Sequence, residues 1–182
     1  MPEKQKVNET HSRYPLLERK ESMSKKIVTY FSAGGNTRTL AKTLAEAAGA
    51  ELYEIRPELP YERKDLNWMD KQSRSTLEMQ DPNCRPAMAA QEIPAEEADV
   101  IFLGFPIWWY REPSIIDSFL DAYDFTGKTV VPFFTSGGSE LGEGQGRIEK
   151  LAKGAKVLEG RRFRARASES ELKNWLAALK LD

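Results

Sequence analysis

The sequence has 182 residues, of which 40% are hydrophobic and 30% are charged, enough for one globular domain with a substantial core. Its formal net charge is −1, and no basic patch predicts binding to nucleic acid or to an anionic membrane. The longest apolar stretch, residues 100–110, is interrupted by Gly104 and Pro106 and is too short to span a bilayer. These features predict a soluble protein without nucleic-acid or membrane partners.

The chain contains a single cysteine, Cys84, which excludes an internal disulfide framework, and its N-terminal residues include no apolar segment of the signal-peptide type. The predicted location is therefore the reducing cytoplasm. We expect no catalytic cysteine, because a thiol nucleophile needs a nearby base and the only histidine, His11, lies in the polar N-terminal region. The sequence shows no cluster of metal ligands, so no metal site is predicted.

Two regions of different composition divide the chain. Residues 1–24 are rich in Lys, Glu, Ser and Asn and have few aliphatic side chains to bury, which predicts a flexible N-terminal extension. Residues 25–182 are predicted to form the folded domain. A docking arm for a partner protein is the alternative interpretation of the extension.

Apolar segments predict strands at residues 27–31, 51–55, 100–105, 129–134 and 157–163, and they alternate with predicted helices, which is typical of an α/β fold with a parallel sheet. The first, third and fourth strands are almost continuously apolar, as expected when helices cover both faces, whereas residues 51–55 alternate like an edge strand. The predicted architecture is a three-layer sandwich around a five-stranded parallel sheet of order 2-1-3-4-5.

Local signals place some helix ends. The apolar pattern of residues 37–48 predicts a helix that ends at Gly49, and Pro113 is predicted as the first residue of another. Ser168 and Glu171 form a capping-box pattern before the last helix. Pro132 lies inside the fourth predicted strand, where its missing N–H removes a ladder bond, and the sequence does not explain it.

Three loops follow predicted strands and should meet at the carboxyl edge of the sheet, where ligands bind in open α/β folds. The first offers hydroxyls and glycine N–H groups at a helix start, which suits a phosphate, and it lacks the lysine of a triphosphate loop and the spacing of a dinucleotide loop. The second offers an aromatic wall and the third further N–H groups. Together they predict a site for flavin mononucleotide (FMN). The predicted cofactor-binding residues are Ser32, Gly34, Gly35, Asn36, Thr37, Pro106, Ile107, Trp108, Trp109, Tyr110, Thr135, Ser136, Gly137 and Gly138.

Each loop also has a structural alternative. The first is compatible with an ordinary strand-to-helix turn, and the third with a surface loop. The aromatic side chains of the second need a cover, which a flavin or the helix-like run at residues 66–79 would provide. That run belongs to a long connection, residues 56–97, which is expected to lie over one side of the sheet and to border the ligand site.

Four motifs resemble the flavodoxin-like family, in particular bacterial flavodoxins and flavodoxin-like reductases, over residues 24–182. They are Tyr30-Phe31-Ser32-x-x-Gly35-Asn36-Thr37, Asn83-x-Arg85-Pro86, Phe102-Leu103-Gly104-Phe105-Pro106-Ile107-Trp108-Trp109 and Gly127-Lys128-x-x-x-x-Pro132-Phe133-x-Thr135-Ser136-Gly137-Gly138. The resemblance implies a five-stranded parallel sheet with noncovalent FMN at the strand ends, held by residues 32–37, 106–110 and 135–138.

The function that follows is FMN-dependent redox chemistry without a catalytic side chain, with electron transfer to a redox partner protein as the predicted role. An NAD(P)H-dependent reductase of small quinone-like acceptors and a flavin-free interaction module are the alternatives. The near-neutral charge differs from that of acidic electron carriers, and Gly34 replaces a hydroxyl residue of the family loop. Tyr110 stands where similar sequences have glycine. We expect it to resist positive φ, and therefore expect a poorly stabilised flavin semiquinone.

Overall fold

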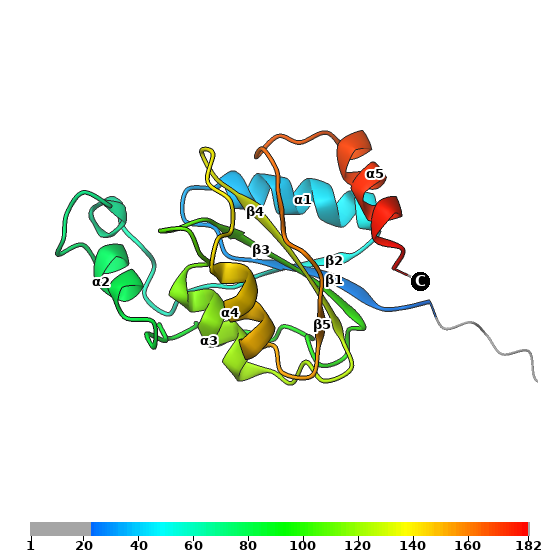
Figure 1. The fold of residues 1–182 in the computed structure, drawn as a ribbon, viewed down its shortest axis with the longest axis horizontal. Helices are drawn as coiled ribbons and strands as arrows, with labels where there is room; N and C mark the ends of the chain where they lie inside the picture. Colours follow the sequence, from blue (N-terminus) through cyan, green and yellow to red (C-terminus); the bar gives the residue numbers. More distant parts are fainter. Residues whose placement is uncertain (1–22, 182) are drawn as a thin grey trace, which may run out of the picture.

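The computed structural model describes residues 23–181, so almost all of the predicted N-terminal extension, His11 included, lies outside the described residues. A parallel sheet of order β2-β1-β3-β4-β5 forms the centre, as predicted, with β6 paired to β4 (Figure 1). The strands are β1 (Lys26–Tyr30), β2 (Glu51–Glu54), β3 (Val100–Pro106), β4 (Thr129–Thr135), β5 (Lys156–Val157) and β6 (Arg161–Arg162).

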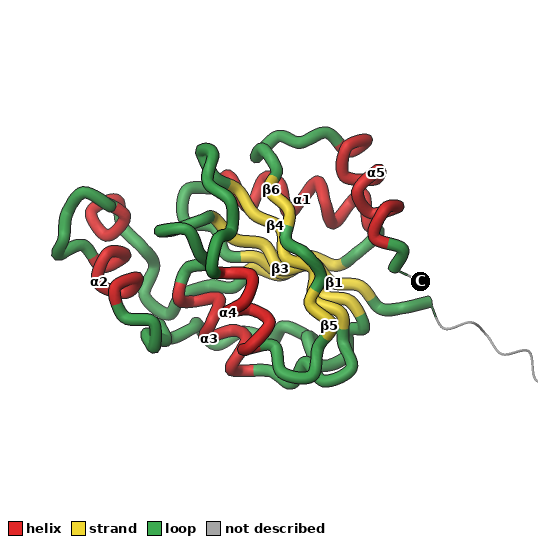
Figure 2. The backbone as a smooth tube through the Cα atoms, viewed as in Figure 1, coloured by secondary structure: helices red, strands yellow, loops and turns green. Residues whose placement is uncertain are grey.

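Helices cover both faces of the sheet (Figure 2). One face packs against α1 and α5, and the other against α3 and α4. A short 3-10 helix, η1, and α2 lie to one side of these layers (Figure 1). The helices are α1 (Asn36–Ala48), η1 (Arg63–Leu66), α2 (Arg74–Gln80), α3 (Ser114–Ala122), α4 (Gly144–Leu151) and α5 (Glu169–Leu179). None of the helices within residues 23–181 is long and apolar enough to cross a membrane.

The alternation of side chains along the strands builds the two cores. In β1, Val28 and Tyr30 point to the α1 and α5 side, whereas Ile27 points to the α3 and α4 side. All three are almost completely buried. Burial on both faces explains why the central strands are continuously apolar, and it fixes their register because a one-residue slip would exchange the faces.

Three predicted elements differ from the structure. The strand predicted at residues 157–163 is split into β5 and β6. The helix-like run at residues 66–79 begins at the end of η1, continues as an irregular segment and ends within α2. Pro113 is the N-cap of α3 and not its first helical residue. Pro113 lies at φ −60 and ψ 147, an extended conformation that ends the preceding segment. Gly49 and Ser168 mark helix ends as predicted, Gly49 in the left-handed conformation and Ser168 as an acceptor from the Glu171 N–H.

The split of the last strand explains Pro132. The carbonyl oxygens of Val130 and Phe134 accept hydrogen bonds from the N–H groups of Leu158 and Phe163. The backbone groups of every second residue in this part of β4 therefore point toward β5 and β6. Pro132 lies midway between Val130 and Phe134 and faces the gap between β5 and β6. No strand residue pairs with β4 at this point, so the N–H group that proline lacks is not needed for the ladder. Gly160 occupies this gap, and a Cβ there would lie 3.2 Å from Cβ of Pro132.

Candidate functional site

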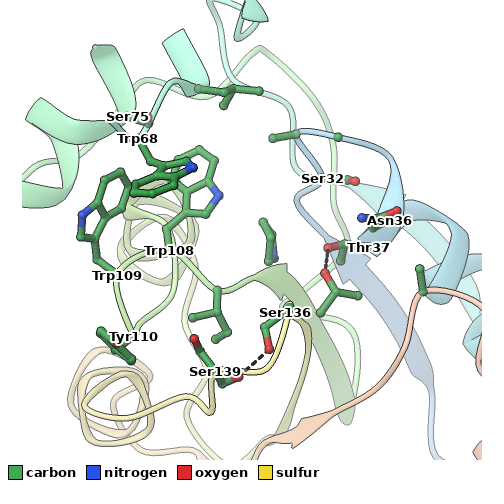
Figure 3. A pocket seen from close by; sticks show the side chains of 18 of the residues that line it. Ser32, Asn36, Thr37, Trp68, Ser75, Trp108, Trp109, Tyr110, Ser136 and Ser139 are labelled. Carbon is green, nitrogen blue, oxygen red and sulfur yellow. Dashed lines mark hydrogen bonds between the residues drawn. The ribbon is translucent and has the colours of Figure 1, made fainter. Parts of the chain in front are cut away.

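The three predicted loops line one pocket of about 750 Å³ at the carboxyl edge of the sheet (Figure 3). This is the size range of small-molecule sites. The structure brings every predicted cofactor-binding residue except Gly35 and Gly138 to the lining of this pocket. Among the described residues that line it, none carries a charged side chain. A phosphate bound here would therefore depend on N–H groups and hydroxyls.

The first loop leads directly into the start of α1. Gly35 adopts φ 92, a left-handed conformation that glycine takes easily, and its N–H donates to Ser32 Oγ at 3.1 Å. No side chain caps α1, so the first N–H groups of the helix stay available for an anion. The Thr37 hydroxyl is buried and lies 2.8 Å from the Thr135 hydroxyl, which ties the first loop to the third.

In the second loop, Trp108 is the anchored aromatic residue. Its ring packs edge-on against Phe31 and Tyr61, with centroids 5.6 Å and 5.5 Å away. Burial, followed by the hydrogen bond to Glu78, raises the pKa of Tyr61, so its hydroxyl stays neutral and donates to that carboxylate. Arg74 lies 3.9 Å over the Tyr61 ring, and these contacts attach α2 to the wall of the pocket.

The next two residues form a two-residue hairpin turn. Trp108 and Arg111 exchange backbone hydrogen bonds of 3.0 Å and 3.2 Å, and between them Trp109 and Tyr110 adopt φ 46 and φ 64. Positive φ at both central positions is the pattern of a type I′ turn. The expectation that Tyr110 resists positive φ is therefore wrong, and the structure gives no reason to expect a poorly stabilised semiquinone. The reason is that both ends of the turn are fixed by packed side chains, the half-buried Trp108 and the buried Arg111.

Arg111 fixes the second end of this turn. Its guanidinium is buried, donates to the Glu112 carbonyl at 3.0 Å and to Ser114 Oγ at 3.2 Å, and lies 3.4 Å from Asp117 Oδ2. Arg147 of α4 donates to Glu112 Oε1 at 2.8 Å and to Asp117 Oδ2 at 2.5 Å. We call Arg111, Glu112, Asp117 and Arg147 the carboxylate cluster. The contacts of this cluster fix Arg111 and therefore the position of the turn.

The strained turn gives a prediction for Tyr110. Non-glycine residues in the left-handed region carry roughly 1 to 2 kcal/mol of strain, which glycine does not. Tyr110→Gly is therefore expected to unfold at a higher temperature than Tyr110→Ala, by about 2 to 8 °C for a domain of this size. The two variants lose the same aromatic ring, so their difference in thermal midpoint reports the backbone alone. Equal midpoints would contradict a strained turn.

The third loop contacts the second through its backbone. The Ser136 hydroxyl donates to the Ser139 carbonyl at 2.5 Å and accepts from the Gly138 N–H at 3.3 Å, which curls the loop. Gly142, at φ 55, packs under Tyr110, and a Cβ at this position would lie 2.8 Å from the Tyr110 carbonyl oxygen. Glycine at this position therefore permits a close approach of the two loops.

Seven further residues line the pocket and are not among the predicted cofactor-binding residues. Trp68 and Ser75 stand out because they come from the long connection that was expected to border the site. No local motif marks them, since the segment reaches the pocket only through the packing of α2 on Tyr61. The seven residues are Ala33, Leu66, Trp68, Ser75, Ser139, Phe163 and Ala165.

Comparisons with known proteins identify the family. The family model for flavodoxin matches residues 25–179. The chain belongs to the flavodoxin family. No curated protein matches it. Among solved structures, this flavodoxin-family chain is 42% identical to a protein from Bacteroides eggerthii named as a flavoprotein, over 87% of this chain and 99% of that one, with a TM-score of 0.82.

Two further structures are similar to this chain, the first in sequence and fold and the second in fold. A protein from Bacteroides uniformis, also named as a flavoprotein, is 42% identical over 85% of this chain and 98% of its own, with a TM-score of 0.80. A flavoprotein from Lactobacillus acidophilus in complex with FMN shares the fold, with 23% identity over 84% of this chain and 99% of its own and a TM-score of 0.64.

Proposed function

We propose that this flavodoxin-family protein binds FMN in the pocket and acts through it as a redox protein. The observation that carries the proposal is that the phosphate-type loop, the aromatic loop and the polar third loop line one pocket without a charged side chain. The family and the FMN complex of the structurally similar Lactobacillus acidophilus protein support the same cofactor.

The residues present fit FMN. Space is open at Gly34 and Gly35, where a Cβ would meet no atom within 4 Å, and the uncapped start of α1 lies beside them. Trp108 and Ile107 offer apolar surface to a ring, whereas the curled loop at Ser136 offers polar groups to its edge. When bound, FMN supplies one-electron and two-electron transfer, and the chain binds and orients it and limits water access.

For the role of the bound flavin, we propose electron transfer to or from a partner protein. The lining supports this role, because the uncapped start of α1 would be occupied by the FMN phosphate, and the described part of the pocket has no second anion site for the diphosphate of a pyridine nucleotide. The second candidate is a reductase of quinone-like acceptors, favoured by the exposed aromatic rings of Trp68 and Trp109 at the pocket. The cytoplasmic location stays a prediction.

The decisive experiment is to load the purified protein with FMN and measure the stoichiometry by absorbance. A flavin that NADPH bleaches only when a flavodoxin reductase is also added supports the carrier role. Bleaching by NADH or NADPH alone supports the reductase. A protein that binds no FMN contradicts the proposal and favours the interaction module.

Thr37→Val tests the position of the phosphate. The substitution removes a buried hydroxyl at nearly constant volume, and we expect FMN binding to weaken by roughly 1 to 3 kcal/mol. Thr43→Val is the matched control, because its hydroxyl contacts only the Thr39 carbonyl further along α1, at 3.3 Å. If Thr37→Val binds FMN as tightly as Thr43→Val, the phosphate lies elsewhere.

A further inference from the structure

Positive charge is concentrated in one short stretch between β5 and α5. Residues 161–166 contain four arginines and no acidic residue, in a chain whose formal net charge is −1. All four arginines are exposed. The near-neutral charge of the whole chain hides this stretch, because acidic residues are in excess elsewhere. We call Arg161, Arg162, Arg164 and Arg166 the arginine segment.

The sheet places the arginine segment at the carboxyl edge, beside the pocket. Arg161 and Arg162 form β6 and pair in parallel with Phe133 and Phe134 near the end of β4. Figure 2 shows β6 beside β4. Because the two strands are parallel, the chain leaves β6 at the same edge as the three pocket loops.

A tight turn holds two of the arginines at the mouth of the pocket. The Ala167 N–H donates to the Arg164 carbonyl at 3.0 Å, which closes a turn over residues 164–167. Within this turn Ala165 lines the pocket, whereas Arg164 and Arg166 do not. The two side chains are exposed outside the lining. They therefore present their charge to a large partner at the mouth and not to a small molecule inside.

Arg164 and Arg166 are also the uncommitted charges of the arginine segment. The Arg161 guanidinium lies 4.9 Å from the centroid of the Phe163 ring, and Arg162 pairs with Glu140 at 3.2 Å. Within residues 23–181, Arg164 and Arg166 form no ion pair. Their charge is therefore available to attract an anionic surface over about one Debye length.

The other side of the mouth is aromatic. In Figure 3 the chain after β6, in pale orange, passes on the Thr37 side of the pocket, and Trp109 and Tyr110 lie across the pocket from it. Trp109 is 42% exposed and Tyr110 68% exposed. Aromatic residues and arginine are the residue types enriched in protein–protein interfaces.

A nucleic acid fits this surface less well. Its phosphates need a longer track of cations, and α5 begins with Glu169 and Glu171 directly after the arginine segment. The arrangement favours a protein with a compact acidic surface, because such a surface can meet the arginines and the aromatic rings together.

We propose that the arginine segment docks a partner protein whose own redox centre is surrounded by aspartate and glutamate. Opposite charges speed the encounter and orient the partner over the pocket. This inference rests on the proposed function, electron transfer by bound FMN, and it names the chemistry of the partner. Two electrons, passed one at a time to two oxidised partner molecules, return the reduced flavin to its oxidised form, and its two protons go to water.

The test measures electron transfer from the FMN-loaded protein, reduced without oxygen by one equivalent of dithionite, to two haem proteins. Cytochrome b5 has an acidic surface around its haem, and cytochrome c has a basic one. At low ionic strength, Arg164→Gln/Arg166→Gln is expected to slow the reduction of cytochrome b5 by about tenfold and not to slow that of cytochrome c. At about 0.5 M salt the effect should vanish, because salt screens the charges. Stopped-flow absorbance measures these rates.

Two further double variants are the controls. Lys150→Gln/Lys153→Gln removes the same net charge at the C-terminal end of α4, where the chain returns to the opposite edge of the sheet. It should change neither rate by more than about twofold. Arg164→Lys/Arg166→Lys keeps both charges and should keep the rate with cytochrome b5. Unchanged rates in Arg164→Gln/Arg166→Gln, or an equal loss in the α4 variant, would overturn the proposal.

FMN affinity is measured for each variant by itself. A marked loss of FMN binding in Arg164→Gln/Arg166→Gln would assign the arginines to the cofactor phosphate and overturn the docking surface, while the proposed function stands. If the unchanged protein binds no FMN, the proposed function fails on its own. Calorimetric titration with cytochrome b5 at low ionic strength then tests the docking: binding that needs Arg164 and Arg166 supports it, and no binding overturns it.

Two other occupants of the surface are tested directly. One is a single strand of DNA of about 20 nucleotides. The other is a second copy of this chain, detected by sedimentation at low ionic strength. DNA that binds more tightly than cytochrome b5, or a dimer that only Arg164→Gln/Arg166→Gln fails to form, would overturn the proposal.

Discussion

Above pH 8, where Glu112 is ionised, replacing Arg147 with methionine is expected to lower the free energy of unfolding by about 3 to 5 kcal/mol, the effect of removing one partner from buried charges. Arg147 donates to Glu112 Oε1 and Asp117 Oδ2, and both carboxyl side chains are 0% exposed. Methionine keeps much of the apolar stem and removes the cation. Chemical denaturation of the two proteins measures the difference, and the thermal midpoint should fall by about 6 to 20 °C.

Arg85→Met provides the matched control. Arg85 reaches the same Asp117 Oδ2, but at 3.7 Å and from the surface, and its closer contact is the half-exposed Asp121 at 2.6 Å. Ion pairs of this exposed kind contribute about 0 to 1 kcal/mol. A loss for Arg147→Met no larger than that for Arg85→Met would show that the carboxylate cluster does not depend on its second arginine.

Features encoded in short stretches of sequence were predictable. The continuous apolar runs of β1, β3 and β4 gave the parallel sheet and its order, because only strands covered on both faces need such runs. The loops after these strands were predictable as a group, because parallel strands place their carboxyl ends at one edge. Gly49 marked the end of α1 through its left-handed conformation.

Features that depend on contacts between distant residues were not predictable. The split between β5 and β6 lies opposite Pro132, and neither segment alone reveals this pairing. Positive φ at Tyr110 follows from the anchoring of Trp108 and Arg111, which overrides the local preference of an aromatic residue. Trp68 and Ser75 reach the pocket through the packing of α2, and the carboxylate cluster joins residues from α3 and α4 that only the tertiary fold brings together.

The carboxylate cluster also makes stability depend on pH. Burial, followed by the neighbouring Asp117 carboxyl, raises the pKa of Glu112 from its ordinary value of 4.5 to about 8, although the hydrogen bond from Arg147 opposes the shift. Between these two values the folded protein keeps a proton that the unfolded chain releases. The stabilising contribution of Glu112 is therefore fully present below pH 4.5 and is lost as the pH rises toward 8.

Glu112→Gln should remove this loss, because glutamine resembles the protonated acid and does not titrate. We expect the free energy of unfolding of the unchanged protein to fall relative to Glu112→Gln by on the order of 2 to 3 kcal/mol between pH 5 and pH 8, since one proton contributes at most about 1.4 kcal/mol per pH unit. Urea denaturation across this range measures both curves. Glu159→Gln, at an exposed position, is the control and should follow the unchanged protein. Parallel curves for Glu112→Gln and the unchanged protein would mean that Glu112 is already ionised at pH 5 in the folded state, held so by Arg111 and Arg147.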